Sequence, residues 1–236
     1  MSNPTIDVCL SPNLIDLYDL EGKSVVVVDI LRATSVMVTA LAHGAAGIIP
    51  VATIEEAKMY QHRGYLCAAE RGGMQVQGFA LDNSPFSYMH EGVSEQEIVI
   101  TTTNGTLAIS KSRQADEILV GAFLNLSSVA NYLIENRRDV VVHCAGWKGK
   151  TNMEDTLYAG ALVEMLADTH EIVCDTPQVA LNYYQSVKSN LFDTVATSSH
   201  ARRLNKLHIE KDIAYCLEID RYDLVPIMEG KILRCV

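Results

Sequence analysis

The sequence of 236 residues lacks the features that mark several classes of protein. No apolar run approaches the ~20 residues that span a bilayer. The N-terminal residues have no basic segment followed by an apolar core, as a signal peptide would. The net charge is −10 and basic clusters are absent, which disfavours a nucleic-acid-binding surface. We therefore expect a cytoplasmic protein with neither a membrane nor a nucleic acid among its partners.

Motifs of several enzyme classes are also missing. The six cysteines are scattered without a C-x-x-C pair, which argues against a zinc site or a thioredoxin-like motif. The chain has no G-x-x-x-x-G-K-[ST] loop for nucleotide phosphates and no G-x-S-x-G turn for a nucleophilic serine. An anionic substrate stays compatible with the acidic net charge, because cationic groups in a cleft outweigh the global sign locally.

Apolar runs alternate with segments of helical periodicity along the chain, which is typical of βαβ units and a largely parallel sheet. We expect a single α/β domain over residues 1–236, with a C-terminal hairpin around Glu229-Gly230 and a mainly helical stretch over about 176–217. Further helices are expected after the capping box that begins at Thr53, and after Asn125 and Asn152. The expected strands are 6–10, 24–30, 47–51, 65–69, 97–102, 117–121 and 139–145.

Polar residues gather where these strands end, and ligands of open α/β sheets bind beyond the carboxyl ends of the strands. The first such segment is "VVVVDILRATS", in which four valines lead to Asp29 and Arg32. These two residues are either a strand cap with a surface ion pair, or a metal-binding or catalytic carboxylate with a guanidinium for an oxyanion. The segment alone does not decide between the two.

The second segment is "AAERGGMQVQGFALDNSP", in which Glu70 and Arg71 precede Gly72 and Gly73 and a long loop. Two glycines let backbone amides approach a ligand closely, and loops of this length are often functional. We interpret Glu70 and Arg71 as functional residues. Ser84, which precedes a proline, is assigned mainly to a helix start.

The third and fourth segments are "TTTNGT" and "CAGWKGKTNMEDTLYAG". The run from Thr103 to Thr106 opens a helix, and is either an ordinary cap and turn or an anion cradle. Glu154 and Asp155 stand in the first turn of another helix, where the dipole favours acids in any case, but carboxylates there also suit magnesium. Trp147, the single tryptophan, is assigned to packing.

Among the histidines, His143 lies inside a predicted strand and is interpreted as a hydrogen-bonded core imidazole. His200 in "SSHARRL" shares a helix start with Arg202 and Arg203, which is a plausible anion-facing turn.

Carboxylates for a cation and guanidiniums for an oxyanion at one sheet edge suit a magnesium-assisted phosphate reaction. We expect Mg²⁺ as the cofactor, held by a subset of Asp29, Glu70, Glu154 and Asp155. The expected catalytic residues are Asp29 (the favoured nucleophile or base), Arg32, Glu70 and Arg71. The expected substrate-binding residues are Gly72, Gly73, Thr103, Asn104, Gly105 and Thr106.

These segments resemble the 2-phosphosulfolactate phosphatase family, known as the ComB family. The matching pieces "VVVVDILRATS", "AERGGMQVQGFALDNSP", "TTTNGT", "GAFLNLSSVA" and "AGWKGKTNMEDTLYAG" run in family order from about residue 24 to 165, and "SSHARRL" and "KDIAYCLEID" extend the likeness. The resemblance implies a three-layer α/β/α fold with a largely parallel central sheet. It also implies magnesium-dependent hydrolysis of (2R)-O-phospho-3-sulfolactate to sulfolactate and phosphate, a step in coenzyme M biosynthesis.

Two other functions stay open at this point. One is a non-catalytic module that binds a phosphate or sulfonate metabolite, and the other is phosphoryl transfer to an acceptor other than water, which the missing nucleotide loop disfavours. Under each hypothesis the partner is a small anionic molecule, and for the phosphatase and the phosphoryl transferase this molecule is phosphorylated. The sequence leaves homo-oligomerisation open.

Overall fold

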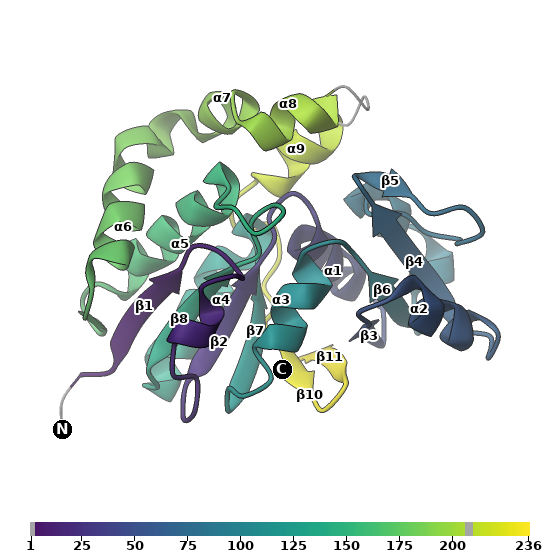
Figure 1. Ribbon diagram of the computed structural model, residues 1–236, viewed down its shortest axis with the longest axis horizontal. Helices are drawn as coiled ribbons and strands as arrows, with labels where there is room; N and C mark the ends of the chain where they lie inside the picture. The colour runs from purple at the N-terminus through teal and green to yellow at the C-terminus, as the bar shows by residue number, and fades with distance from the viewer. Residues whose placement is uncertain (1–2, 206–209) are drawn as a thin grey trace.

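The computed structural model describes residues 3–205 and 210–236. In this part of the chain the strands form an eleven-stranded sheet in the order β5-β4-β6-β3-β11-β10-β7-β2-β8-β1-β9 (Figure 1). The strands are β1 (Thr5–Cys9), β2 (Ser24–Val28), β3 (Gly47–Pro50), β4 (Leu66–Arg71), β5 (Met74–Gln75), β6 (Glu97–Thr101), β7 (Glu117–Gly121), β8 (Val140–Cys144), β9 (Glu171–Ile172), β10 (Pro226–Glu229) and β11 (Ile232–Cys235). The α-helices are α1 (Ala33–Ala42), α2 (Ile54–Gln61), α3 (Gly105–Lys111), α4 (Leu126–Asn136), α5 (Met153–Leu166), α6 (Asp175–Val187), α7 (Leu191–Ala196), α8 (Ser199–Asn205) and α9 (Glu210–Cys216).

The sheet consists of two parallel groups joined by the C-terminal hairpin. Strands β4, β6 and β3 form one group, and β7, β2, β8, β1 and β9 form the other. The hairpin β10–β11 lies between them and pairs antiparallel with β7 through Ile227 and with β3 through Leu233. The expected largely parallel sheet and the hairpin are thus confirmed, although the sequence did not place the hairpin inside the sheet.

Helices cover both faces of the larger group, as the strictly apolar strands require. Val27 of β2 is in register with His143 of β8, whose ring accepts or donates a 2.8 Å hydrogen bond with Ser112 at the end of α3. Val26, on the opposite face, lies close to Tyr158 of α5 over Gly121. Helices α4, α5 and α6 contact one another in turn on that side. The three-layer α/β/α fold is therefore confirmed, and so is the interpretation of His143 as a bonded core imidazole.

The smaller group buries two separate apolar faces. Ile49, Cys67 and Val99 form a small cluster with Ala57 of α2. The alternate residues, such as Ile48, belong to the main core. This alternation is the period of two that a strand covered on both faces shows.

Most expected elements match the structure to within one or two residues. The expected strand 24–30 ends at Val28, so that Asp29 lies just beyond it, whereas the strand expected at 65–69 continues to Arg71. The Thr53 hydroxyl caps α2 by accepting the Glu56 amide at 3.1 Å. The range 176–217 carries α6 to α9, apart from residues 206–209, which lie outside the described residues.

The start of the segment at Pro85 differs from expectation. Pro85 begins a 3-10 helix, but the Ser84 hydroxyl does not cap it and donates instead to Asp212 at 3.1 Å. Within residues 3–205 and 210–236, the helices are too short or too polar to cross a membrane.

Candidate active site

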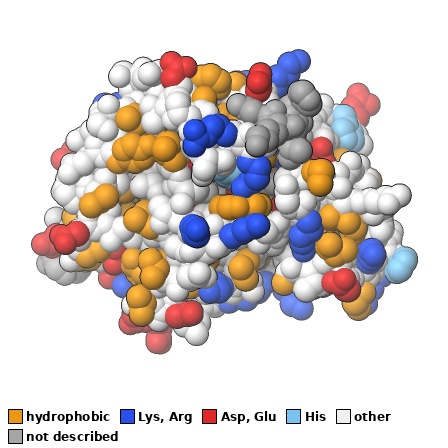
Figure 2. Space-filling view, turned by 45° about the horizontal axis from the view of Figure 1, so that its top comes forward, with side chains coloured by type: hydrophobic (Ala, Val, Ile, Leu, Met, Phe, Trp, Pro, Cys, Tyr) orange, Lys and Arg blue, Asp and Glu red, His pale blue; other side chains and the backbone are white. Residues whose placement is uncertain are grey.

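The ends of four strands and helix α8 converge on one small pocket. The segments that follow β2, β4, β6 and β8 all contribute side chains, as expected for the carboxyl ends of parallel strands. In Figure 2, Lys and Arg side chains gather in the middle of the face that comes forward from the top of Figure 1, where α8 lies. The pocket is lined by Asp29, Leu31, Arg32, Glu70, Gly73, Asn83, Asn104, Trp147, His200, Arg203 and Leu204.

Asp29 lies directly after β2 and is 4% exposed. Its backbone is held in place by Thr34, because the Asp29 amide donates to the Thr34 hydroxyl oxygen at 3.0 Å and the Asp29 carbonyl accepts the Thr34 amide at 3.0 Å. Its Oδ1 accepts a long hydrogen bond of 3.4 Å from the Ala33 amide. No hydrogen bond to Oδ2 is found within the described residues, so this oxygen is free to contact a ligand.

Asp155 is buried behind Asp29 and ties two strand ends together. One carboxylate oxygen accepts the Ile30 amide at 2.9 Å after β2, and the other accepts the Gly146 amide at 3.0 Å after β8. The Asn152 side chain caps α5 by accepting the Asp155 amide at 3.1 Å. Asp155 therefore fixes the geometry of the pocket, and both of its oxygens are already engaged by the backbone.

Electrostatics distinguish Asp29 within the pocket. Burial raises the pKa of its carboxyl group, and the nearby negative charges of Asp155 and Glu70 raise it further, against the opposing effect of His200. Burial also raises the pKa of Asp155, and the charge of Glu154 adds to this effect. A strongly perturbed carboxyl in a cleft is a candidate for catalysis or for cation binding.

Arg32 is held in a buried ion pair. Its Nη1 donates to Asp212 of α9, and its Nη2 donates to the Gly73 carbonyl at 3.2 Å. Asp212 also accepts the Ser84 hydroxyl. These bonds orient the guanidinium at the pocket wall, although its acidic partner lies 180 positions away in the chain. The sequence analysis singled out Arg32 but not Asp212, although Asp212 belongs to the family-like segment "KDIAYCLEID".

Gly72 and Gly73 form the two-residue turn of a hairpin between β4 and β5. Arg71 pairs with Met74, and both glycines have positive φ values of 68° and 89°, which a type I′ turn requires. The Gly73 amide donates to the Glu70 carboxylate within the turn. Gly73 lines the pocket, while Gly72 lies outside it. The glycines therefore shape the hairpin, and the Gly73 amide is occupied by Glu70.

Glu70 connects the hairpin to the segment after β6. Its Oε2 accepts the Thr103 amide at 3.2 Å, and the Thr103 hydroxyl lies 3.3 Å from both carboxylate oxygens. Thr103 thus acts through Glu70, and Asn104 is the member of this segment that lines the pocket. Thr106 instead closes the first turn of α3, with its hydroxyl donating to the Thr102 carbonyl at 3.0 Å.

Gly105 permits a close approach between two segments. A Cβ atom at this position would lie 2.6 Å from the Ala33 Cβ and 3.0 Å from the Asp29 Oδ2. The Asn-Gly pair therefore serves as more than an ordinary turn, because only glycine lets the start of α3 reach the end of β2.

Arg71 does not line this pocket. Its guanidinium donates to the Glu70 carbonyl at 2.6 Å and to the Thr101 hydroxyl at 3.0 Å. The structure thus brings Asp29, Arg32, Glu70 and Asn104 together, and holds Arg71 against Thr101 of β6.

Four side chains contact one another in series at the pocket, and we call this series the ladder: Glu154, His200, Trp147 and Arg203. Glu154 is fully buried and bonds Nδ1 of His200 through Oε1, while its Oε2 has no partner among the described residues. The His200 ring stacks on Trp147 at 5.6 Å between centroids, and the Arg203 guanidinium lies 3.4 Å above the Trp147 ring. The sequence singled out His200 and Arg203, but assigned Trp147 to packing alone. Trp147 in fact forms part of the pocket wall.

The carboxylates suit a magnesium ion in part. Within residues 3–205 and 210–236, no group of three or more His, Cys, Asp or Glu side chains is arranged to hold a metal. Asp29 and Glu70 line the pocket, whereas Asp155 is engaged by backbone amides and Glu154 by His200. Magnesium is commonly held by one or two carboxylates together with waters and substrate phosphate. A cation beside Asp29 would also relieve the negative charges that raise its pKa.

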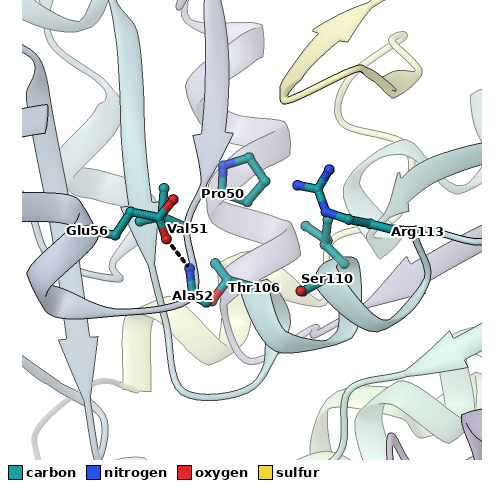
Figure 3. A pocket seen from close by; sticks show the side chains of 8 residues that line it. Pro50, Val51, Ala52, Glu56, Thr106, Ser110 and Arg113 are labelled. Carbon is teal, nitrogen blue, oxygen red and sulfur yellow. Dashed lines mark hydrogen bonds between the residues drawn. The ribbon is translucent and has the colours of Figure 1, made fainter.

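A second pocket lies on the smaller strand group, away from this set of residues. It is lined by the end of β3 and one side of α3, and Figure 3 shows Glu56 turned to the Ala52 amide and Arg113 at the opposite wall. Thr106 belongs to this pocket, whereas Asp29, Arg32 and Glu70 do not. We therefore place the candidate site in the first pocket.

Comparisons with known proteins agree over nearly the whole chain. A family model described as 2-phosphosulpholactate phosphatase matches residues 9–231. A protein of Caldanaerobacter subterraneus subsp. tengcongensis is 41% identical over 227 residues, covering 94% of each chain, and one of Thermotoga maritima is 42% identical over 221 residues, again covering 94% of each. One of Clostridium tetani is 34% identical over 232 residues, covering 97% of this chain and 99% of the relative. Each of the three is named probable 2-phosphosulfolactate phosphatase.

Proposed function

Because the chain belongs to the 2-phosphosulfolactate phosphatase family, we propose that it hydrolyses (2R)-O-phospho-3-sulfolactate to sulfolactate and phosphate with the help of magnesium. The observation that carries this proposal is the convergence of Asp29, Arg32 and Glu70 on one pocket from separate strand ends. The pocket offers a carboxylate with a raised pKa beside an oriented guanidinium. The guanidinium can stabilise charge that develops on the phosphoryl oxygens, and the carboxylate can act as a nucleophile or a base.

The protein's own groups divide the work as follows. Arg32, fixed by Asp212 and the Gly73 carbonyl, faces the phosphoryl oxygens and stabilises the charge they carry in the transition state. Asn104 and Asn83 supply amide groups at the same wall, and Asn83 Oδ1 is buried without a partner in the described residues.

Asp29 acts on the attacking side. In one route its free Oδ2 attacks phosphorus and water then releases the phosphate, and in the other it orients a water molecule for direct attack. Both routes break the bond between phosphorus and the C2 oxygen and transfer a proton to that oxygen. Both require Asp29 to be ionised, which its raised pKa opposes unless a cation is present.

Asp29 and Glu70 would hold the magnesium ion. When bound, magnesium neutralises charge on the phosphoryl oxygens and on Asp29. Thr103 and the Gly73 amide keep Glu70 in place for this task. Asp155 and Glu154 do not line the pocket, so the proposed ligand set is limited to Asp29 and Glu70.

Residues 29 to 212 contribute to one pocket and its supports, so the chain acts as a single catalytic domain. The substrate carries several negative charges and does not cross membranes unaided, so the reaction belongs in the cytoplasm where such metabolites are made and kept.

Phosphate release from a panel of phosphorylated hydroxy acids, with magnesium and with a chelator, tests the proposed function. The proposal predicts magnesium-dependent release, fastest for (2R)-O-phospho-3-sulfolactate. Tight binding of these esters without phosphate release, at any magnesium concentration, would favour a non-catalytic binding module instead. Turnover in ¹⁸O-labelled water with no label in the phosphate would point to another acceptor.

A further inference from the structure

Arg203 is a partly buried guanidinium whose hydrogen-bond donors are not all used. Its Nε and Nη2 atoms are buried and have no partner among the described residues, although Arg203 lines the pocket. Arg32 differs in this respect, because it is engaged by Asp212 and the Gly73 carbonyl. A buried donor without an acceptor is unfavourable, so the unpaired donors of Arg203 favour the binding of an anion.

The ladder beneath Arg203 fixes its direction. The guanidinium lies 3.4 Å above the Trp147 ring, and the Trp147 ring stacks on His200 at 5.6 Å with an interplanar angle of 28°. His200 is in turn bonded to the fully buried Glu154. A guanidinium stacked on an aromatic face keeps its edge free for in-plane hydrogen bonds. The edge of Arg203 is therefore available for a bidentate contact.

The two arginines stand on different sides of the pocket. Arg32 follows β2 immediately after Asp29, where the reacting phosphoryl group lies in the proposed function. Arg203 belongs to α8 and rests on the segment after β8. Burial lowers the pKa of Arg203, and the charges of Glu154 and Glu70 offset part of this effect. A guanidinium nevertheless keeps its proton in proteins, so Arg203 is a cation. Its position suits the part of the substrate that is not transferred.

We propose that Arg203, held on Trp147, is the specificity residue that binds a non-transferred anion of the substrate, the sulfonate or the carboxylate of a sulfolactate-like product. This inference rests on the proposed function for the identity of the substrate. Both anions present paired oxygens that match the guanidinium fork. A phosphate ester without such a group leaves the Arg203 donors unpaired, and is therefore discriminated against.

The affinity of the protein for small anions tests this role without any turnover. The probes are 3-sulfolactate, isethionate (sulfonate only), lactate (carboxylate only) and inorganic phosphate, each titrated by calorimetry. Trp147 is the only tryptophan, so its fluorescence gives a second signal from the site itself. For Arg203→Met we expect the Kd of 3-sulfolactate to rise by about 10- to 100-fold, the range for loss of a charge-assisted contact. The Kd of phosphate should change by no more than about 2-fold, within the scatter of substitutions at a distance from the ligand.

Arg202→Met is the matched control, because Arg202 is the exposed neighbour in α8 and does not line the pocket. This variant should keep the wild-type Kd for every probe. Arg203→Lys keeps the charge without the fork, and should bind 3-sulfolactate with intermediate affinity. A loss confined to isethionate assigns the contact to the sulfonate, and a loss confined to lactate assigns it to the carboxylate.

Two results would overturn the inference. An equal loss for phosphate and 3-sulfolactate would place Arg203 at the transferred group, and an unchanged Kd for 3-sulfolactate would show that it binds no part of the ligand. A failed phosphatase assay would leave these affinities untouched, so the inference and the proposed function fail separately.

Discussion

Replacing Asp29 with asparagine should make the protein more stable at neutral pH while removing its turnover. Asn preserves the size and shape of the side chain but carries no charge. Asp29 is buried, and the charges of Asp155 and Glu70 add to the effect of burial in raising its pKa. Folding therefore works against the ionised form of Asp29, and the substitution removes this unfavourable term together with the reactive carboxylate.

The pH dependence of this effect follows from the direction of the pKa change. The folded-state pKa of Asp29 lies above the ordinary value of 3.8. The contribution of Asp29 to the unfolding free energy is therefore fully present below pH 3.8, and it is lost as the pH rises through the folded-state pKa. One pKa unit corresponds to about 1.4 kcal/mol. For a chain of 236 residues, ~1.4 kcal/mol corresponds to a change in Tm of about 3 °C. Asp29→Asn should thus raise Tm by at least about 3 °C at pH 7 and by little at pH 4.

The assay combines thermal unfolding with phosphate release. Tm is measured at pH 4 and pH 7 in the absence of magnesium, and phosphate release at pH 7 in its presence. Asp168→Asn, which neutralises an exposed carboxylate after α5, is the control for the change in net charge alone. In the wild type, added magnesium should raise Tm at pH 7, and in Asp29→Asn this increase should shrink.

The reasoning is refuted if Asp29→Asn lowers Tm at pH 7, because burial would then not oppose the charge of Asp29. It is also refuted if the variant releases phosphate at close to the wild-type rate, because Asp29 would then have no part in the reaction.

Three further substitutions test the supports of the site. Gly105→Ala should slow turnover and lower stability by about 1–3 kcal/mol in urea unfolding, since its Cβ would lie 2.6 Å from that of Ala33; wild-type kinetics would refute the close approach. Asp155→Asn should lower the unfolding free energy by about 2–4 kcal/mol, because an amide group cannot accept from both the Ile30 and Gly146 amides; an unchanged urea midpoint would contradict this bridge. Burial and the charge of Lys111 lower the pKa of His143 from 6.5 to about 4, so wild-type stability should fall by up to about 3 kcal/mol as the pH drops from 6.5 towards 4. His143→Leu should remove most of this fall in urea unfolding at the two pH values, and an identical fall in both proteins would exclude His143 as its source.

The fold followed from the sequence where local signals and packing agreed. The aliphatic run from Val25 to Val28 predicted a strand covered on both faces, and the structure places this fully buried strand between β7 and β8 of the larger strand group. Because parallel strands end at a common edge, the same rule correctly brought Asp29, Arg32, Glu70 and Asn104 into one pocket.

Other features of the site depend on contacts that no local pattern encodes. Arg32 finds its acidic partner Asp212 in α9, and the sequence between them gives no sign of the pairing. The position of Asp155 beyond a strand end suits a metal ligand as well as an acceptor for backbone amides. Only the structure shows that its two carboxylate oxygens accept the Ile30 and Gly146 amides.

One missed feature did have a signal. Gly72-Gly73 stands between two short strand segments and is a standard two-residue hairpin turn. The prediction for this pair, that its backbone amides approach a ligand, leaves out the hairpin turn. The hairpin directs Arg71 to Thr101 and Glu70 to Thr103, and so separates two adjacent charged residues that the sequence placed together.

A crystal structure of the protein with magnesium and 3-sulfolactate tests the central claim most directly. The account predicts the ion at Asp29 and Glu70 and the sulfolactate between Arg32 and Arg203, with no change in the ladder of Glu154, His200 and Trp147. Sulfolactate bound instead in the pocket between Glu56 and Arg113, with Asp29 and Glu70 contacting neither ligand nor ion, would contradict it.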